Sequence, residues 1–109
     1  MSRRDILPVH QMLDYAREAV TILQDKQRAD LENDRLLDLA LTRLLEIIGE
    51  AANRVPEEIH EAHPEIAWGQ IISLRNRLIH GYDSIDFDIL WTIVKNDLPE
   101  LIENLEKIA

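Results

Sequence analysis

Residues 34–54, with the sequence DRLLDLALTRLLEIIGEAANR, decide which class of fold this chain adopts. The segment is rich in apolar residues at helical spacings: Leu36, Leu37, Leu39, Ala40, Leu41, Leu44, Leu45, Ile47, Ile48, Ala51 and Ala52. On a helix, these residues cover most of the circumference instead of one stripe. A helix of this kind is either central in a bundle or buried by a partner subunit.

Gly49 interrupts this apolar helix between Ile48 and Glu50. A glycine inside a helix costs about 1 kcal/mol of stability relative to alanine. Its presence therefore predicts the close approach of another helix at this position. The alternative is that the position simply tolerates glycine.

A further amphipathic helix is predicted on the N-terminal side, from Asp5 to about Lys26. Its apolar residues form one stripe with alternating spacings of three and four: Ile6, Val9, Leu13, Ala16, Val20 and Leu23. Asp5 is the expected N-cap, and Pro8 falls in the first turn, where no backbone donor is needed. The polar residues 25–30 are expected to form a solvated connection to the apolar helix.

Three more helices are predicted on the C-terminal side: Pro56–His63, Trp68–His80 and Phe87–Ile108. Gly81 is the expected left-handed stop of the second one. Asp86 should cap the third, which Pro99 should kink. No segment shows sustained alternation with a period of two. The sequence thus predicts an all-α, up-and-down bundle of four main helices plus a short one, within a single domain of residues 1–109.

Length and composition describe an ordinary globular protein. The chain has 109 residues, of which 46% are hydrophobic and 30% are charged. No apolar run approaches the roughly 20 residues that a membrane span needs. Residues 1–5 lack the features of a signal peptide, and the absence of cysteine fits a reducing compartment. The expected location is the cytoplasm, with no membrane association.

The charge balance restricts any interaction with nucleic acid. Twelve basic and twenty-one acidic residues give a net charge of −9, which repels nucleic acid at long range. RNA binding therefore requires a local patch without acids. Residues 66–82 contain no Asp or Glu, and they include Arg75, Arg77 and His80.

Arg75 and His80 form the candidate catalytic pair, because an imidazole near a fixed cation can support phosphodiester cleavage without a metal. The spacing alone is weak support, because three times in this chain an arginine is followed by a histidine five or six positions later: Arg4 with His10, Arg54 with His60, and Arg75 with His80. The first two pairs each enclose a proline. Only the third lies in an uninterrupted, acid-free helical stretch. The alternative is an ordinary helix end with a capping histidine and surface arginines.

The predicted helix places His80 in its last turn, where the helix dipole favours the protonated imidazole. The nearby arginines act in the opposite direction, so the net effect on the pKa of His80 stays open. Five residues along a helix correspond to a rotation of about 140°. Arg75 and His80 would therefore lie on different faces, with Asn76 one turn before His80. This geometry favours a site that a second copy of the chain completes.

The sequence Arg75-Asn76-Arg77-Leu78-Ile79-His80-Gly81-Tyr82 resembles the Arg-x4-His-x-Tyr motif of HepT-like toxins in the HEPN superfamily. The resemblance extends over essentially the whole chain. Residues 43–52 are similar to the second helix of that family, residues 63–68 to its approach to the motif, and residues 98–101 to its last helix.

This resemblance implies a homodimer in which two motifs meet in a cleft at the interface. The implied activity is a metal-independent RNA endonuclease, without a cofactor, acting on tRNA or mRNA. His80 would be the general base or acid, and Arg75 would bind the scissile phosphate. Asn76 would orient the site, while Arg77 could hold a neighbouring phosphate.

The resemblance also implies a protein partner. HepT-like toxins belong to prokaryotic type VII toxin–antitoxin systems, in which a minimal nucleotidyltransferase (MNT) is the antitoxin. The partner would neutralise the toxin by adding AMP to the motif tyrosine, which is Tyr82 here. Two alternatives remain: an inactive module that docks a nucleotidyltransferase, and a purely structural dimer.

The other candidate residues have simpler explanations. His60 and His63 could form a metal pair, but no third ligand is suitably spaced, so a solvated surface is the preferred interpretation. Trp68 and Trp91 could stack on bases, yet packing is the preferred role. His10 is expected at the surface or at the boundary of the core.

Overall fold

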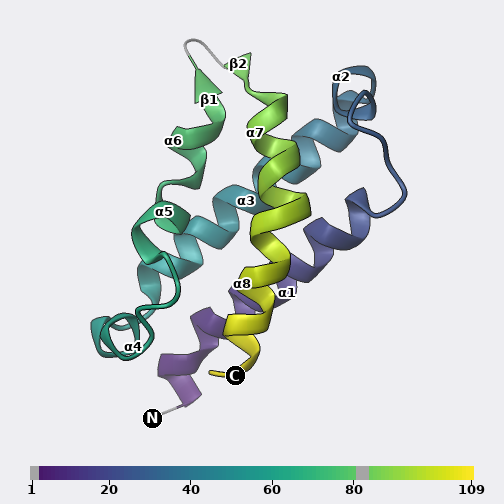
Figure 1. Cartoon of the computed structure of the whole chain (residues 1–109). Coiled ribbons are helices and arrows are strands. Elements are labelled where there is room, and N and C mark those ends of the chain that lie inside the picture. Colours follow the sequence, from purple (N-terminus) through teal and green to yellow (C-terminus); the bar gives the residue numbers. More distant parts are fainter. Residues whose placement is uncertain (1–2, 81–83) are drawn as a thin grey trace.

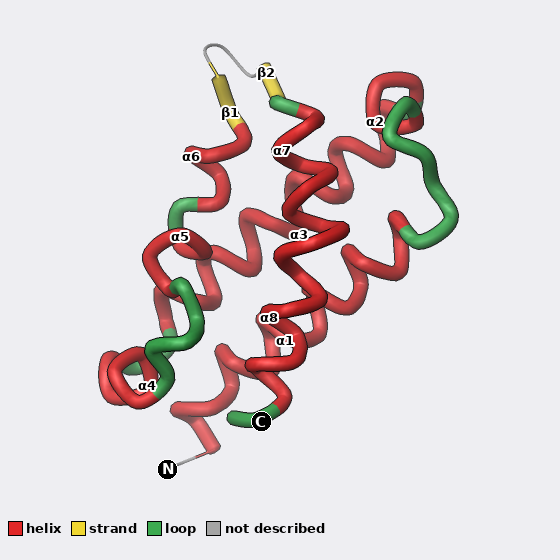
Figure 2. The backbone as a smooth tube through the Cα atoms, viewed as in Figure 1, coloured by secondary structure: helices red, strands yellow, loops and turns green. Residues whose placement is uncertain are grey.

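The computed structural model of the chain describes residues 3–80 and 84–109. Figures 1 and 2 show that nearly all of this part is helical, with one two-stranded hairpin at one end of the molecule. The first four helices are α1 (Arg3–Leu23), α2 (Asp30–Asn33), α3 (Arg35–Arg54) and α4 (Glu57–Ala62). They are followed by α5 (Trp68–Ile72), α6 (Leu74–Leu78), β1 (Ile79–His80), β2 (Ser84–Ile85), α7 (Phe87–Thr92), the π-helical turn η1 (Ile93–Asp97) and α8 (Leu98–Glu106). The predicted all-α fold class is confirmed.

Helix α3 is the central element, which is one of the two arrangements that its sequence predicts. It packs against α1, α2, α5 and α6, and Figure 1 shows it crossing behind the column formed by α7 and α8. Its start matches the predicted boundary, because the carboxylate of Asp34 accepts a hydrogen bond from the Leu37 amide at 3.1 Å. The described residues leave one side of α3 uncovered. Leu36 and Leu39 there are 79% and 46% exposed.

Helix α1 contributes the predicted apolar stripe to the core. Val9, Leu13, Ala16 and Leu23 are buried against α3 and α8, together with Met12 and Ala19 from the same helix. The helix ends three residues before the predicted Lys26. After the connection, the short helix α2 anchors itself through the fully buried Leu31.

Gly49 permits the predicted close contact between helices. A Cβ atom at this position would lie 2.9 Å from the carbonyl oxygen of Ile71 and 3.3 Å from that of Ile72. Both oxygens belong to the backbone of α5, so a side chain would push α5 away from α3. The interpretation of Gly49 as a packing residue is confirmed.

The predicted helix Trp68–His80 is confirmed over residues 68–72 and 74–78 but is wrong at Ser73 and at residues 79–80. It breaks at Ser73, whose backbone has φ −94° and ψ 14°, and helix α6 then ends at Leu78. Residues 79–80 are extended and pair antiparallel with residues 84–85. The Asp86 amide also donates to the Leu78 carbonyl at 2.8 Å. Pairing with a strand that follows in the chain thus replaces the last helical turn, and β-branched Ile79 and Ile85, which form a register pair, favour such extended backbone.

This correction removes the helical argument for His80. The residue lies on β1 and not in the last turn of a helix, so neither the dipole of α6 nor helical spacing relates it to Asn76. The predicted stop at Gly81 lies outside the described residues.

The last helical segment begins as predicted. The carboxylate of Asp86 caps α7 by accepting from the Ile89 amide at 3.0 Å. Pro99 has no amide hydrogen to donate to the preceding turn, and the chain adopts the π-helical turn η1 immediately before α8. Within that turn, the Lys95 ammonium donates to the Leu23 carbonyl at 3.0 Å and so ties the end of α1 to the C-terminal segment.

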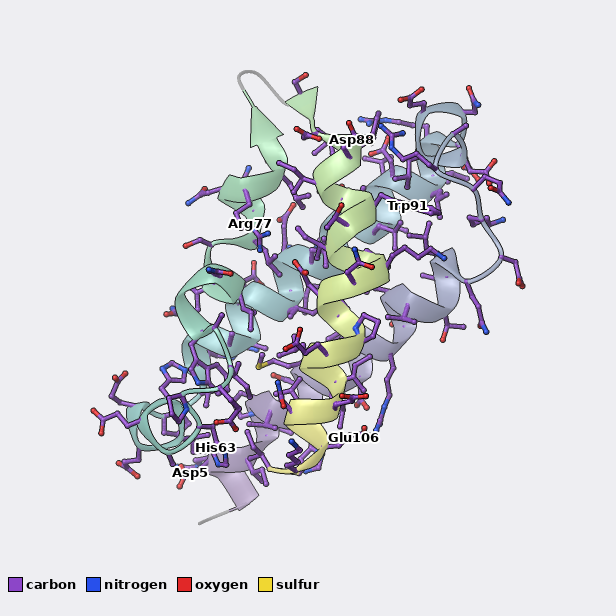
Figure 3. The ribbon with its side chains drawn as sticks, viewed as in Figure 1. Asp5, His63, Arg77, Asp88, Trp91 and Glu106 are labelled. Carbon is purple, nitrogen blue, oxygen red and sulfur yellow. The ribbon has the colours of Figure 1, made fainter. Side chains whose placement is uncertain are left out.

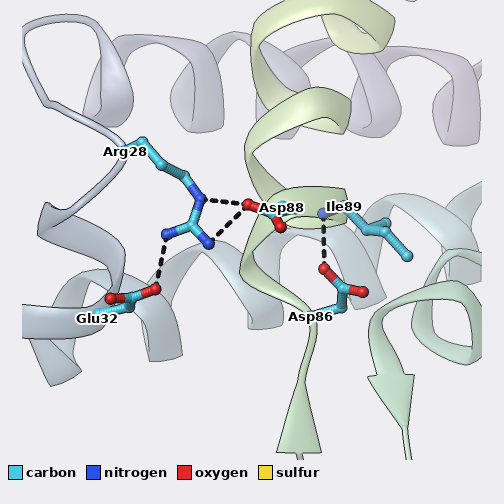
Figure 4. A network of polar contacts seen from close by, with 5 residues as sticks. All are labelled: Arg28, Glu32, Asp86, Asp88 and Ile89. Atoms are coloured by element: carbon cyan, nitrogen blue, oxygen red, sulfur yellow. Dashed lines mark hydrogen bonds and ion pairs between the residues drawn. The ribbon is translucent and has the colours of Figure 1, made fainter.

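An ion-pair network also connects the start of α7 with the segment around α2. Figure 4 shows Arg28, from the connection between α1 and α2, reaching both Asp88 and Glu32. Its Nε and Nη2 atoms lie 2.8 and 2.7 Å from Asp88 Oδ1, and its Nη1 lies 3.1 Å from Glu32 Oε1. The hydrogen bond with Asp88 is the main cause that raises the pKa of Arg28. The network therefore anchors the element that follows the hairpin.

None of the helices in residues 3–80 and 84–109 is long and apolar enough to cross a membrane.

Candidate functional site

Arg75 is presented to solvent by the short helix α6. Its side chain is 64% exposed, and its Nε atom lies 4.0 Å from Oε1 of Glu46 on α3. The break at Ser73 starts α6 as a separate turn after α5, which packs on α3 through the Gly49 contact. The scaffold thus holds Arg75 beside α3 and leaves its guanidinium accessible.

Asn76 lies beside Arg75 at the edge of a surface hollow of about 260 Å³. The hollow lies between α3 and α5–α6. Its lining combines apolar side chains with amides, acids and one arginine: Leu45, Glu46, Gly49, Glu50, Asn53, Ile72, Arg75 and Asn76. Arg75 and Glu46 also border a second hollow of about 200 Å³, towards the hairpin residues Ile79 and Ile85. The predicted site residues Arg75 and Asn76 are therefore brought together.

The surroundings of Arg75 contain acids despite the acid-free sequence of residues 66–82. Glu46 and Glu50 reach the first hollow from α3, because this helix packs alongside α5 and α6. Both carboxylates are paired with Arg43, at 3.3 Å for Glu46 and 3.6 Å for Glu50. The charged neighbours of Arg75 at the first hollow are thus the carboxylates of Glu46 and Glu50, together with the Arg43 guanidinium that pairs with both. The expectation of a local patch without acids holds along the sequence but not in space.

Arg77 lies on another side of α6. Its Nη2 atom is 3.6 Å from Oδ2 of Asp97 in the π-helical turn, and Figure 3 shows its side chain between α6 and the α7–α8 column. It borders a hollow with Asp86 and Asp88 and another with Asp97 and Leu98. The structure does not bring Arg77 into either hollow that Arg75 borders.

His80 lies two residues beyond the end of α6, on strand β1, where its backbone pairs with Ser84. The backbone from Arg75 to His80 therefore runs through the end of α6 and then along the extended strand β1. Tyr82, the expected site of modification, lies outside the described residues.

His60 differs from the predicted solvated residue. Its side chain is only 15% exposed, its Nε2 atom lies 3.0 Å from the Ala52 carbonyl oxygen, and its ring centroid is 4.4 Å from that of Trp68. The reason is that the His60 ring lies against both the Ala52 carbonyl at the end of α3 and the indole ring of Trp68. Trp68 is buried and its indole donates to the His63 carbonyl at 3.0 Å, so its predicted packing role is confirmed.

The remaining candidates from the sequence are structural or exposed. His63 is paired with the Glu65 carboxylate at 3.2 Å. The pKa of Glu65 is lowered, mainly by the backbone amide of the same residue and further by His63. Trp91 packs against the core with the Lys95 ammonium over its ring, and His10 is exposed. Within the described ranges, no group of three or more His, Cys, Asp or Glu residues could hold a metal ion.

Glu46 was not among the residues that the sequence singled out. It lies within residues 43–52, which carry part of the family resemblance, but the pattern gave it no role. Only the packing of α6 against α3 shows that this carboxylate is the ionic neighbour of Arg75. The motif at residues 75–82 therefore gives no indication that Arg75 contacts Glu46.

The helical fold with its one pair of short strands places an accessible arginine and an amide beside a hollow, and a histidine follows five residues after that arginine in the sequence. The family model described as "Ribonuclease HepT-like" matches residues 12–108. The chain therefore belongs to the HepT-like ribonuclease family.

Curated relatives agree with this family. A protein of Methanocaldococcus jannaschii, named for an inferred RNase activity, is 35% identical over 107 residues, which span 97% of this chain and 98% of the relative. The "Probable ribonuclease HepT" of Thermococcus cleftensis is 38% identical over 95 residues, covering 84% and 86% of the two chains. No solved structure gives a significant match.

Proposed function

We propose that this protein is an endoribonuclease that cleaves RNA without a metal and acts as the toxin of a type VII (HEPN/MNT) toxin–antitoxin system. Membership of the HepT-like ribonuclease family supports the coarse activity. The observation that carries the assignment to a site is the pair Arg75–Asn76, exposed on α6 beside a hollow and five residues before His80.

The proposed reaction is attack of a ribose 2′-hydroxyl on the adjacent phosphorus. The 2′-oxygen forms a bond to phosphorus while the bond to the 5′-oxygen breaks, which leaves a cyclic phosphate and a free 5′-hydroxyl. His80 would accept the proton from the 2′-hydroxyl or donate one to the leaving 5′-oxygen. Arg75 would bind the phosphate oxygens and stabilise the charge that develops on them, and Asn76 would orient the reacting groups.

The proposed active form is a homodimer. The apolar side chains that the fold leaves exposed include Leu36, Leu39 and Ile72. Ile72 borders the first hollow beside Arg75, and Leu39 borders the second. A second copy that covers this face would therefore bring its own motif close to Arg75. Covering apolar surface also supplies the driving force for association.

The proposed role of Arg77 is to hold a phosphate further along the RNA strand. Because Arg77 lies between α6 and the C-terminal column, that phosphate would lie on another side of α6 from Arg75. The Arg77 side chain would also have to exchange its contact with Asp97 for the RNA phosphate.

The proposed antitoxin is a minimal nucleotidyltransferase that transfers AMP to Tyr82 in the cytoplasm. The added group is bulky and anionic, so it would block RNA by size and by charge. A second candidate function is an inactive module that docks the same partner. The observations that favour this alternative are the net charge of −9 and the carboxylates of Glu46 and Glu50 beside Arg75, both of which repel RNA.

The test uses the purified chain with tRNA and mRNA in the presence of EDTA. Cleavage that His80→Ala and Arg75→Ala abolish would support the nuclease. Intact RNA, or cleavage that His80→Ala leaves unchanged, would contradict it. Formation of a stable complex with a nucleotidyltransferase, without cleavage by the free chain, would favour the docking module. Intact mass after incubation with that partner and ATP would show whether AMP is added, and Tyr82→Phe is the matched control.

A further inference from the structure

Glu46 lies between two arginines and presents one carboxylate oxygen to each. Its Oε2 atom is 3.3 Å from Nη1 of Arg43, one turn earlier on α3, and its Oε1 atom is 4.0 Å from Nε of Arg75 on α6. The Glu46 side chain is 26% exposed, far less than that of Arg75. Glu46 is thus the more buried member of the pair, and its contact with Arg75 is an electrostatic one at 4.0 Å and not a hydrogen bond.

Because Glu46 contacts Arg75 through its Nε atom, this contact determines which nitrogens of the guanidinium group remain available to a ligand. A guanidinium offers donors along two edges, one of which includes Nε, while the far edge is formed by the two terminal nitrogens. Arg75 turns its Nε towards Glu46. Its terminal nitrogens have no ion-pair partner among the residues that the structure describes. A pair of parallel donors is the geometry that binds two phosphate oxygens at once.

The backbone fixes the position of Glu46 relative to α6. Glu46 and Gly49 are one turn apart on α3 and border the same hollow. At Gly49, the backbones of α3 and α5 are in close contact, with Ile71 O only 2.9 Å from where a Cβ atom would lie. The separation between Glu46 and the start of α6 is therefore set by main-chain packing and not by flexible side chains.

We propose that Glu46 is a positioning residue, which holds Arg75 so that its terminal nitrogens face the scissile phosphate. This inference rests on the proposed ribonuclease function. Arg43 keeps the second oxygen of Glu46 engaged and offsets its negative charge, so the carboxylate can orient Arg75 with less repulsion of the RNA. Glu46 acts through Arg75 and does not itself contact the substrate.

Glu50 offers a matched control for this proposal. It lies one turn after Glu46, pairs with the same Arg43 at 3.6 Å and borders the same hollow, but it forms no ion pair with Arg75 in the described structure. Glu46→Gln and Glu50→Gln each remove one negative charge from the same region. Only Glu46→Gln releases Arg75. The two variants should have similar thermal stability, which circular dichroism can check.

The kinetic test compares steady-state RNA cleavage by these two variants with that of the wild type. We expect Glu46→Gln to lower kcat by about tenfold or more with a smaller change in KM, because a misplaced catalytic cation loses transition-state contacts. Glu50→Gln should stay within about twofold of the wild-type kcat, a difference too small to indicate a lost catalytic contact. In an Arg75→Lys background, Glu46→Gln should have no further effect on kcat. Equal losses of kcat in Glu46→Gln and Glu50→Gln would overturn the proposal.

A second measurement does not depend on activity. The Nε–H group of Arg75 gives an NMR signal whose order parameter reports how firmly the guanidinium is held. We expect Glu46→Gln to lower this order parameter in the free protein, and Glu50→Gln to leave it unchanged. Equal mobility of Arg75 in the wild type and in Glu46→Gln would refute the positioning role. Absence of RNA cleavage by the wild type, in contrast, would refute only the proposed function.

Discussion

Arg75 is the residue whose substitution should most clearly lower RNA cleavage without lowering the stability of the fold. Its side chain is largely exposed and has one long ionic contact, with Glu46, so Arg75→Ala should change the free energy of unfolding by less than about 0.5 kcal/mol. Cleavage of RNA should fall by about a hundredfold or more, because the cation that stabilises the transition state is lost. Denaturant unfolding and a cleavage assay on the same sample measure the two effects.

Arg17→Ala is the control, since Arg17 is also an exposed arginine that pairs with a glutamate, Glu106 on α8. It should leave both quantities unchanged. A large loss of stability in Arg75→Ala would instead mean that the residue belongs to the scaffold.

Gly49 should behave in the opposite way to an ordinary helical glycine. Gly49→Ala places a Cβ atom against the carbonyl of Ile71, and we expect a net loss of about 1–2 kcal/mol, because overpacking outweighs the helix propensity of alanine. A Cβ atom at Gly69 would meet no heavy atom of another segment within 4 Å among the described residues. Gly69→Ala should therefore stabilise the chain by up to about 1 kcal/mol. Thermal unfolding measures both, and equal effects would contradict the packing role of Gly49.

At the scale of the helices, the cap of α3 is a specific source of stability. Asp34 accepts the Leu37 amide, so Asp34→Ala should lower the free energy of unfolding by about 1 kcal/mol. Asp34→Asn keeps an acceptor at the N-cap and should lose much less. Urea denaturation distinguishes the two variants. Equal losses would show that the charge, rather than the cap, is responsible.

Helix boundaries that depend on local chemistry could be predicted from the sequence. Asp86 caps α7 as expected, and α3 and α4 begin within one residue of the predicted Asp34 and Pro56. The expected N-cap Asp5 is wrong, because α1 already begins at Arg3 and Asp5 lies within its first turn. The end of the Trp68–His80 segment could not be predicted in this way. It depends on pairing between Ile79 and Ile85, which are six positions apart in the chain, and no local pattern marks that pairing.

In the candidate site too, some features follow from the local sequence and others depend on contacts between distant segments. Exposure of Arg75 and Asn76 on one helix could be predicted from the motif. The location of Arg77 on another side, next to Asp97, depends on how α6 packs against the C-terminal segment. The contact of Arg75 with Glu46 depends on how α6 packs against α3. Both are tertiary contacts between residues at least 20 positions apart, and they lie outside the reach of a motif.

For the whole molecule, the uncovered face of α3 bears on association. Leu36 is 79% exposed and Leu39 is 46% exposed, so a charge at position 36 should prevent dimerisation without disturbing the core. We expect the wild type to sediment as a dimer and Leu36→Asp as a monomer. RNA cleavage by Leu36→Asp should fall at concentrations where the wild type is dimeric.

Leu7→Asp is the control for this experiment, because Leu7 is an exposed leucine on α1, away from the candidate site. It should sediment like the wild type. A monomeric wild type that cleaves RNA at full rate would exclude the dimeric site, while leaving the other roles of Arg75 open.

Helices α5 and α6 contain only five residues each, separated by the break at Ser73. Helices of this length do not persist on their own, so both depend on docking against α3. Local opening should therefore release α5 and α6 while the long α1–α3 pair stays folded. We expect their amides to exchange with solvent before those of α1 and α3. The affinity of Arg75 for a phosphate should then fall on heating at a lower temperature than that at which the whole chain unfolds.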